Sequence, residues 1–136
     1  MKVEEILDAD YRTTEGQQTI QEALFQIPAI RKNFFEGDMV PLEGIEKLIS
    51  SICRKYAIMI QYICPTYIKG KTPLYCVSLK LIEPYSWLGN VYGCCLYEVM
   101  AKAAIRMYSE VKKGTAKLLT ETTYEKRRSN EIKNLH

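Results

Sequence analysis

The side chains of this chain that could do covalent chemistry are few, and the adjacent thiols Cys94 and Cys95 come first. They stand where we predict the last helix to begin, and a helix N-terminus lowers the pKa of a thiol. A reactive thiol also needs a base, an orienting acid or a resolving cysteine, and no such pattern accompanies this pair. We therefore expect both to be small buried residues where the helix enters the core.

Other catalytic sites find less support. The only histidine is His136, so a Ser-His, Cys-His or His-metal site within the body of the chain cannot be assembled. The glycine-containing segment 89–93 lacks the Gly-x-x-x-x-Gly-Lys-Ser/Thr pattern of a phosphate-binding loop. The acidic residues in predicted loops form no paired motif, and we interpret them as solvated charges: Asp8, Asp10, Glu15, Glu36 and Asp38. We predict no enzyme activity, no cofactor and no metal.

Tyrosines and basic residues outside the predicted core are the better candidates for a function. The chain has ten tyrosines, and tyrosine is enriched at recognition surfaces because it joins an apolar ring to a polar tip. Tyrosine also packs ordinary cores, so both interpretations stay open. Basic side chains would attract phosphates if the 65–73 loop lies near the tail, although basic tails are often only solubilising. The candidate partner surface consists of Tyr67, Lys69, Lys71, Tyr85, Lys126, Arg127 and Arg128.

Composition limits the class of protein. The 136 residues suffice for one domain, and a formal net charge of +3 does not by itself indicate nucleic-acid binding. Five cysteines without a Cys-x-x-Cys motif indicate free thiols in a reducing compartment. The longest uncharged run, residues 56–68, is shorter than the ~20 residues that span a bilayer, and the first residues do not resemble a signal peptide. We expect a cytoplasmic protein with no membrane attachment.

Residues 94–113, between two glycines, have the 3.6-residue period of an amphipathic helix. Glu98, Lys102 and Arg106 follow one another at four-residue spacing, and we expect them in water on the polar face. Lys102→Ala should then cost roughly 0.5 kcal/mol or less, whereas Ala103→Asp should unfold the domain. Gly114 suits the C-terminal end. The predicted core face comprises Leu96, Val99, Met100, Ala103, Ala104, Met107 and Val111.

Further elements precede this helix. We predict helices over residues 14–27, with Thr14 and Gln17 as a capping box and Pro28 as the stop, and over residues 41–56. Residues 56–63 favour a central strand, because they are apolar on both faces except at Gln61. A long loop follows at 64–73. Residues 74–82 alternate strictly and predict a strand with one wet face, and residues 87–92 could add a short third strand. The wet face would carry Cys76, Ser78 and Lys80.

The order of elements predicts an α+β fold: a small antiparallel sheet of two to three strands packed with two to three helices, in the order helix, helix, strand, strand, short strand, helix. We expect a single domain over residues 1–114, in which residues 1–12 form an N-terminal arm. Residues 115–136 would be a basic tail, disordered or a frayed helix. Phe34 and Phe35 should anchor a loop onto the core; an exposed pair would instead indicate a partner surface.

Two resemblances arise from the last helix. Residues 96–105 read Leu-Tyr-Glu-Val-Met-Ala-Lys-Ala-Ala-Ile, and the region 41–113 resembles small phage and prophage proteins with an αββα sandwich. These families have no established active site, so the resemblance implies only a phage or mobile-element origin. The order of elements is also similar to that of double-stranded RNA-binding domains. Such domains place a lysine cluster at the start of the last helix, where this chain has Cys94-Cys95-Leu96-Tyr97-Glu98.

These observations favour a small non-enzymatic interaction protein that acts through a protein surface. The alternative is a nucleic-acid-binding module that uses the basic tail and the 65–73 loop. A protein partner is expected in the first case, and formation of a homo-oligomer is left open.

Overall fold

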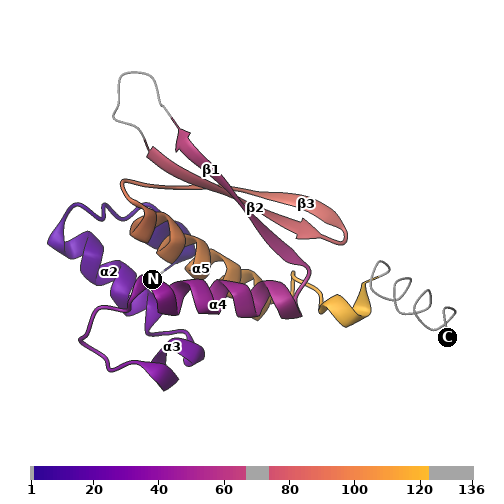
Figure 1. The fold of residues 1–136 in the computed structure, drawn as a ribbon, viewed down its shortest axis with the longest axis horizontal. Helices are drawn as coiled ribbons and strands as arrows, with labels where there is room; N and C mark the ends of the chain where they lie inside the picture. The colour runs from indigo at the N-terminus through magenta and orange to yellow at the C-terminus, as the bar shows by residue number, and fades with distance from the viewer. Residues whose placement is uncertain (1, 67–73, 123–136) are drawn as a thin grey trace, which may run out of the picture.

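The computed structural model of the chain describes residues 2–66 and 74–122, and Figure 1 shows their arrangement. The described residues form helices and one antiparallel sheet, so the predicted α+β class is confirmed. The elements are α1 (Val3–Leu7), α2 (Thr14–Leu24), α3 (Pro28–Asn33), α4 (Leu42–Lys55), β1 (Ile58–Thr66), β2 (Leu74–Ile82), β3 (Tyr85–Gly93), α5 (Leu96–Lys113) and a 3-10 turn at Leu119–Glu121.

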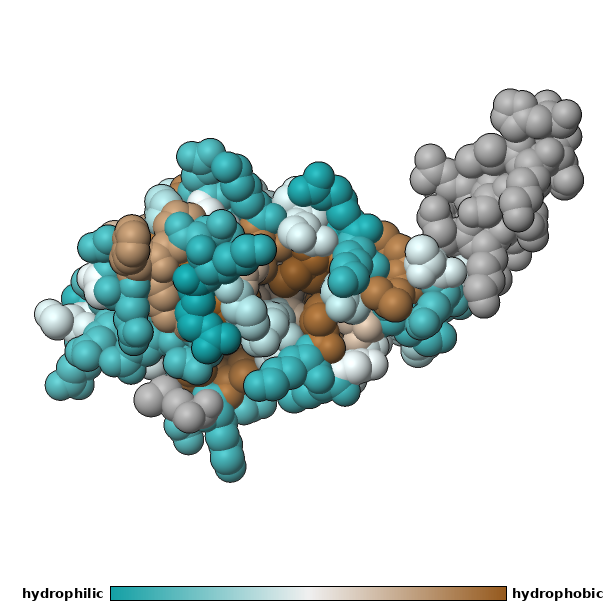
Figure 2. All heavy atoms as spheres, turned by 90° about the horizontal axis from the view of Figure 1, so that it is seen from below, coloured by the Kyte–Doolittle hydropathy of each residue, from teal (hydrophilic) through white to brown (hydrophobic). Residues whose placement is uncertain are grey.

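The described helices all lie on one side of the sheet (Figure 1). Helix α5 packs against β2 and β3 on one side and against α1, α2 and α4 on the other, so it is the centre of the molecule. No described helix lies on the opposite side of the sheet (Figure 1). Seen from the helical side, the surface is mostly hydrophilic, with apolar residues at the floor of a central hollow (Figure 2).

Helix α5 is buried on more than one face, which corrects the predicted wet side. Val99, Ala103 and Met107 are fully buried, as the apolar period predicts, whereas Leu96 is exposed at the end of the helix. Lys102, predicted in water, is only 4% exposed, because the N-terminal segment covers that side of the helix. The predicted end at Gly114 is confirmed, and its φ of 80° is the left-handed conformation that glycine permits.

The N-terminal segment is a docked helix and turn rather than a free arm. Ile6 of α1 is buried, and the backbone oxygen of Ala9 accepts a hydrogen bond from Lys102 Nζ at 2.7 Å. The cap of α2 is Thr13, one residue earlier than predicted, and its Oγ1 accepts from the N–H of Gly16 at 2.9 Å. Pro28, predicted to stop that helix, lies at the first position of α3, where a missing N–H costs nothing.

Helix α4 follows its sequence pattern closely. Ile45, Leu48, Ile49 and Ile52 are buried on one face. On the other face the exposed side chains of Glu43 and Lys47 form an ion pair at 3.2 Å, one helical turn apart. This helix has a single buried side, which is the condition under which an apolar period predicts burial correctly.

The sheet is a meander in the order β1-β2-β3, with both pairs antiparallel. The third strand is confirmed and is longer than predicted. The strand predicted over residues 56–63 is confirmed as β1, but its predicted central position is wrong, because β1 is an edge strand and β2 is the central one. The predicted wet face of β2 is also wrong in part, since Cys76 and Ser78 are buried on it.

The predicted boundary at Gly114 falls too early. Ala116 and Thr122 are buried, and the backbone oxygen of Lys117 accepts a hydrogen bond from the Ala57 N–H at 2.7 Å. Leu118 forms an isolated antiparallel bridge with Tyr56. Residues 115–122 therefore belong to the domain, and the rest of the predicted tail lies outside the described residues.

Candidate functional site

Most of the predicted partner surface lies outside the part of the chain that the structure describes. This holds for Tyr67, Lys69, Lys71, Lys126, Arg127 and Arg128. The remaining residue, Tyr85, begins β3 and is 67% exposed.

The described residues next to the two predicted basic segments lie at different places on the sheet. The 67–73 segment joins the far end of β1 to the start of β2, whereas Tyr85 follows the end of β2. The described chain stops at Thr122, and Leu118 pairs with Tyr56 just before β1 begins, at the same end of the sheet as Tyr85. Thr66, at the end of β1, and Leu118, which pairs with Tyr56, therefore lie at opposite ends of the sheet. The residues of the predicted basic patch lie outside the described part of the chain.

The open side of the sheet carries a group of side chains that we call the outer face. Paired residues in an antiparallel sheet share a face, so the register assigns its members. Five of them are large apolar or aromatic side chains with much of their surface in water: Met59 (41% exposed), Ile82 (40%), Tyr85 (67%), Trp87 (60%) and Tyr92 (41%). The other outer-face residues with described side chains are Gln61, Cys76, Ser78, Lys80 and Asn90.

A bulge in β3 keeps its aromatic residues on one face. Trp87 pairs with Lys80 and Gly89 pairs with Leu79, which leaves Leu88 as an extra residue. If β3 were a regular strand in which Leu88 took an ordinary place, the pleat would turn Asn90 and Tyr92 to the side opposite Trp87, because strand side chains alternate. Gly89 takes a φ of 113° at the bulge, a conformation that favours glycine.

Hydrogen bonds order the outer face. Trp87 Nε1 donates to Ser78 Oγ at 2.9 Å, and Lys80 Nζ donates to Gln61 Oε1 at 3.1 Å. Asn90 Nδ2 donates to the Tyr92 hydroxyl at 3.3 Å. The small side chains Cys76 and Ser78 are buried although they point outward, so larger neighbours cover them. Rings held in this way lose little conformational entropy when a partner binds.

Charge on the outer face is confined to Lys80. Its cross-strand neighbours are Met59 on β1 and Trp87 on β3, so the Lys80 side chain begins between two apolar side chains. The outer face as defined contains no carboxylate.

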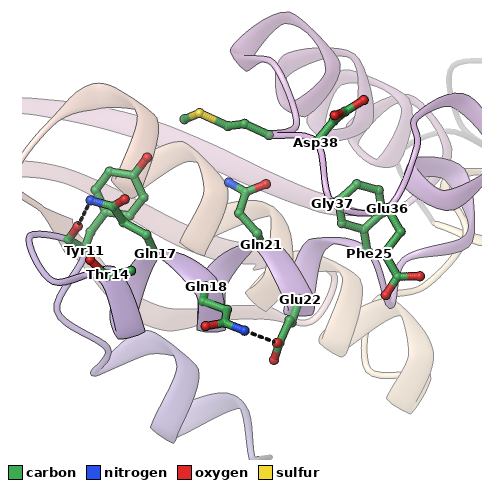
Figure 3. Close-up of a pocket in the computed structure, with 11 residues that line it drawn as sticks. Tyr11, Thr14, Gln17, Gln18, Gln21, Glu22, Phe25, Glu36, Gly37 and Asp38 are labelled. Carbon is green, nitrogen blue, oxygen red and sulfur yellow. Dashed lines mark hydrogen bonds between the residues drawn. The ribbon is translucent and has the colours of Figure 1, made fainter.

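A cavity of about 470 Å³ lies between α2 and the loop before α4 (Figure 3). Gln21 lines this cavity and makes two hydrogen bonds. Its Oε1 accepts from the Val40 N–H at 3.0 Å, and its Nε2 donates to the Tyr97 hydroxyl at 2.7 Å. The Glu22 carboxylate accepts from Gln18 Nε2 at 3.1 Å along the helix, and Asp38 points away from Gln21 (Figure 3). The lining is Tyr11, Thr14, Gln17, Gln18, Gln21, Glu22, Phe25, Glu36, Gly37, Asp38 and Met39.

The polar groups of this cavity serve the fold. Gln21 and Tyr97 tie the chain at Val40 to α2 and α5, because the Tyr97 hydroxyl also donates to the Val40 carbonyl. Among the described residues, every buried side-chain nitrogen or oxygen has a hydrogen-bond partner. No group of three possible metal-binding side chains occurs in the same residues. The outer face is therefore the stronger candidate for a site.

The surroundings of Cys94, at the start of α5, disfavour its thiolate form. Desolvation and the neighbouring Glu98 carboxylate raise the pKa of the Cys94 thiol to about 12, which is opposite to the effect of a helix N-terminus. Glu98 Oε1 accepts from the Cys94 N–H at 2.6 Å, so the acid lies directly beside this residue. The expected burial is wrong for Cys94, which is exposed, and Cys95 is half-buried.

The two phenylalanines before α4 behave differently from each other. Phe34 is half-buried, and its ring lies so close to Gly44 that an added Cβ would be 2.6 Å from it. Phe35 is 82% exposed. Phe34 therefore anchors the loop as expected, and Phe35 does not.

Comparison of the chain with protein-family models, with curated proteins and with solved structures finds no match. The resemblances to phage αββα proteins and to double-stranded RNA-binding domains stay predictions. Among the described residues, no helix combines the length and apolar character required to cross a bilayer.

Proposed function

We propose that this chain is a small non-enzymatic interaction protein that binds a protein partner on the outer face of its sheet. The observation that carries the proposal is the cluster of Met59, Ile82, Tyr85, Trp87 and Tyr92, exposed together on the open side of the sheet. Contiguous exposed apolar surface on a small domain marks an interaction site. Aromatic residues and methionine are also the side chains enriched in interface cores, where charged residues are depleted.

A protein partner fits the outer face better than a nucleic acid does. Aromatic rings could stack on bases, but proteins that bind single strands combine such rings with a positively charged groove. The outer face offers one cation, Lys80, and phosphate contacts supply most of non-specific nucleic-acid affinity. Met59 and Ile82 add aliphatic surface that suits apolar side chains of a protein. An origin in a phage rests only on the resemblance of residues 41–113.

Site-directed photo-crosslinking in a cell lysate tests the proposal. A photoreactive phenylalanine analogue at Tyr85 should capture a specific protein, whereas the same analogue at the exposed Glu46 of α4 should not. Adding Trp87→Ser to the first variant should abolish capture without changing the circular dichroism spectrum. Equal capture from both positions, or capture that survives Trp87→Ser, would count against the outer face.

Nucleic-acid binding is tested separately, because the tail carries Lys126, Arg127 and Arg128. A labelled fifteen-nucleotide thymidine oligomer should show no change in anisotropy with the full chain at low salt. Tight binding that weakens with salt, by roughly 0.7 log units per tenfold salt for each phosphate contact, would favour the alternative function. Loss of that binding on deletion of residues 123–136 would assign it to the tail.

A further inference from the structure

The position of Lys80 constrains what can cover the outer face. Lys80 lies on the central strand β2, between Met59 on β1 and Trp87 on β3, so its side chain leaves the sheet from the middle of the apolar row. Its Nζ donates to Gln61 Oε1, a neutral acceptor on the same face. A partner that covers this row together with Gln61 also removes water from the ammonium group.

Desolvating an ammonium group without a counter-charge is unfavourable and would offset much of the gain from burying the aromatic rings. The outer face cannot supply the counter-charge, since none of its residues is acidic. The missing negative charge must therefore come from the partner.

Building on the proposed function, we propose that the partner presents an acidic residue flanked by apolar side chains, with its carboxylate on Lys80 and its apolar neighbours on Met59 and Trp87. One carboxylate balances the single charge of Lys80, whereas a phosphate group, at about −1.5 to −2, would need a second cation. A second copy of this chain would bring another Lys80 and no acid, so the face is unsuited to pairing with itself.

Trp87 provides a direct readout of binding. It is the only tryptophan of the chain, and it neighbours Lys80 across the strands. The probes are three capped heptapeptides that share leucines at alternate positions and differ only in the central residue, which is glutamate, glutamine or lysine. The glutamate peptide should shift the Trp87 emission, the glutamine peptide should bind at least about tenfold more weakly, and the lysine peptide should not bind, as electrostatic complementarity requires.

A charge exchange completes the test. In Lys80→Glu the order should reverse, with the lysine peptide binding best, while Lys47→Glu on α4 should keep the wild-type order. Equal binding of all three peptides to the wild type would overturn the acidic preference and leave the proposed function standing. Absence of binding by every peptide would overturn the inference too, while the crosslinking experiment decides the proposed function independently. Displacement of the glutamate peptide by the thymidine oligomer would contradict both.

Discussion

Lys102 shows how far the environment of one residue can depart from its type. Its ammonium group forms an ion pair with Glu98 at 2.7 Å, and both side chains are nearly inaccessible to water. It also donates to the carbonyl of Ala9, which lies 93 residues earlier in the chain. Lys102→Ala should leave a buried carboxylate and a buried carbonyl unpaired, at a cost of about 3–5 kcal/mol in the free energy of unfolding.

Lys47→Ala is the matched control for this prediction. Lys47 has the same four-residue spacing to its partner Glu43, but both side chains are in water, so the change should cost about 0.5 kcal/mol or less. Urea denaturation of the two variants measures the difference. Similar small losses would place Lys102 in water and contradict the packing of the N-terminal segment on α5.

The Cys94 thiol should react slowly although it is exposed. Only the thiolate is nucleophilic, and a pKa raised to about 12 keeps the group protonated at neutral pH. Alkylation by iodoacetamide should therefore remain slow at pH 8 and continue to accelerate up to pH 11, whereas a small free thiol levels off above pH 9. Mass mapping of Cys94 after timed alkylation gives the profile, and rapid labelling at pH 7 would contradict it.

The turn between α1 and α2 depends on a close approach at Gly16. A Cβ at this position would lie 1.8 Å from the backbone oxygen of Asp10, which cannot move independently of the turn. Gly16→Ala should thus destabilise by about 1–3 kcal/mol, against the usual stabilising effect of removing glycine from a helix. Limited proteolysis should cut the variant first near residues 8–12. Unchanged stability would show that the turn can shift.

Helix and strand predictions succeed or fail according to how many layers an element contacts. The period of α4 is diagnostic, because Ile45, Leu48 and Ile52 face one layer and the other side faces water. For α5 the same reasoning assigns Glu98 and Lys102 to water, since the sequence does not show that α1 packs on that side. Cys76 and Ser78 on β2 are misread for a related reason, as residues of neighbouring strands cover them.

The site was only partly predictable from the sequence. The sequence places Tyr85 in the candidate partner surface, but it does not group Trp87 and Tyr92 with it. The available signal is the spacing of Tyr85 and Trp87, which are two residues apart like side chains on one face of a strand, although the predicted strand begins only at Trp87. The position of Tyr92 depends on the bulge at Leu88 and Gly89, and Met59 reaches the same face only through the pairing of β1 with β2.

The boundary of the whole domain can be tested by truncation. A chain that ends at Gly114 loses the buried Ala116 and leaves the buried N–H of Ala57 without its acceptor on Lys117. The free energy of unfolding should fall by about 2 kcal/mol, the typical cost of one unsatisfied buried donor with its lost packing. A chain that ends at Thr122 keeps these contacts and should melt close to the full chain. Equal melting temperatures for the two truncations would return the boundary to Gly114.

The central place of α5 bears on how the protein matures during synthesis. Translation proceeds from the N-terminus at about 5–20 residues per second, so α1 to α4 and the three strands leave the ribosome before α5 does. Until then the apolar sides of α2, α4 and the sheet cannot be covered by α5, which is the element that contacts all of them in the folded domain. The nascent chain should therefore complete its core only after α5 has left the ribosome, and prematurely released fragments without α5 should aggregate.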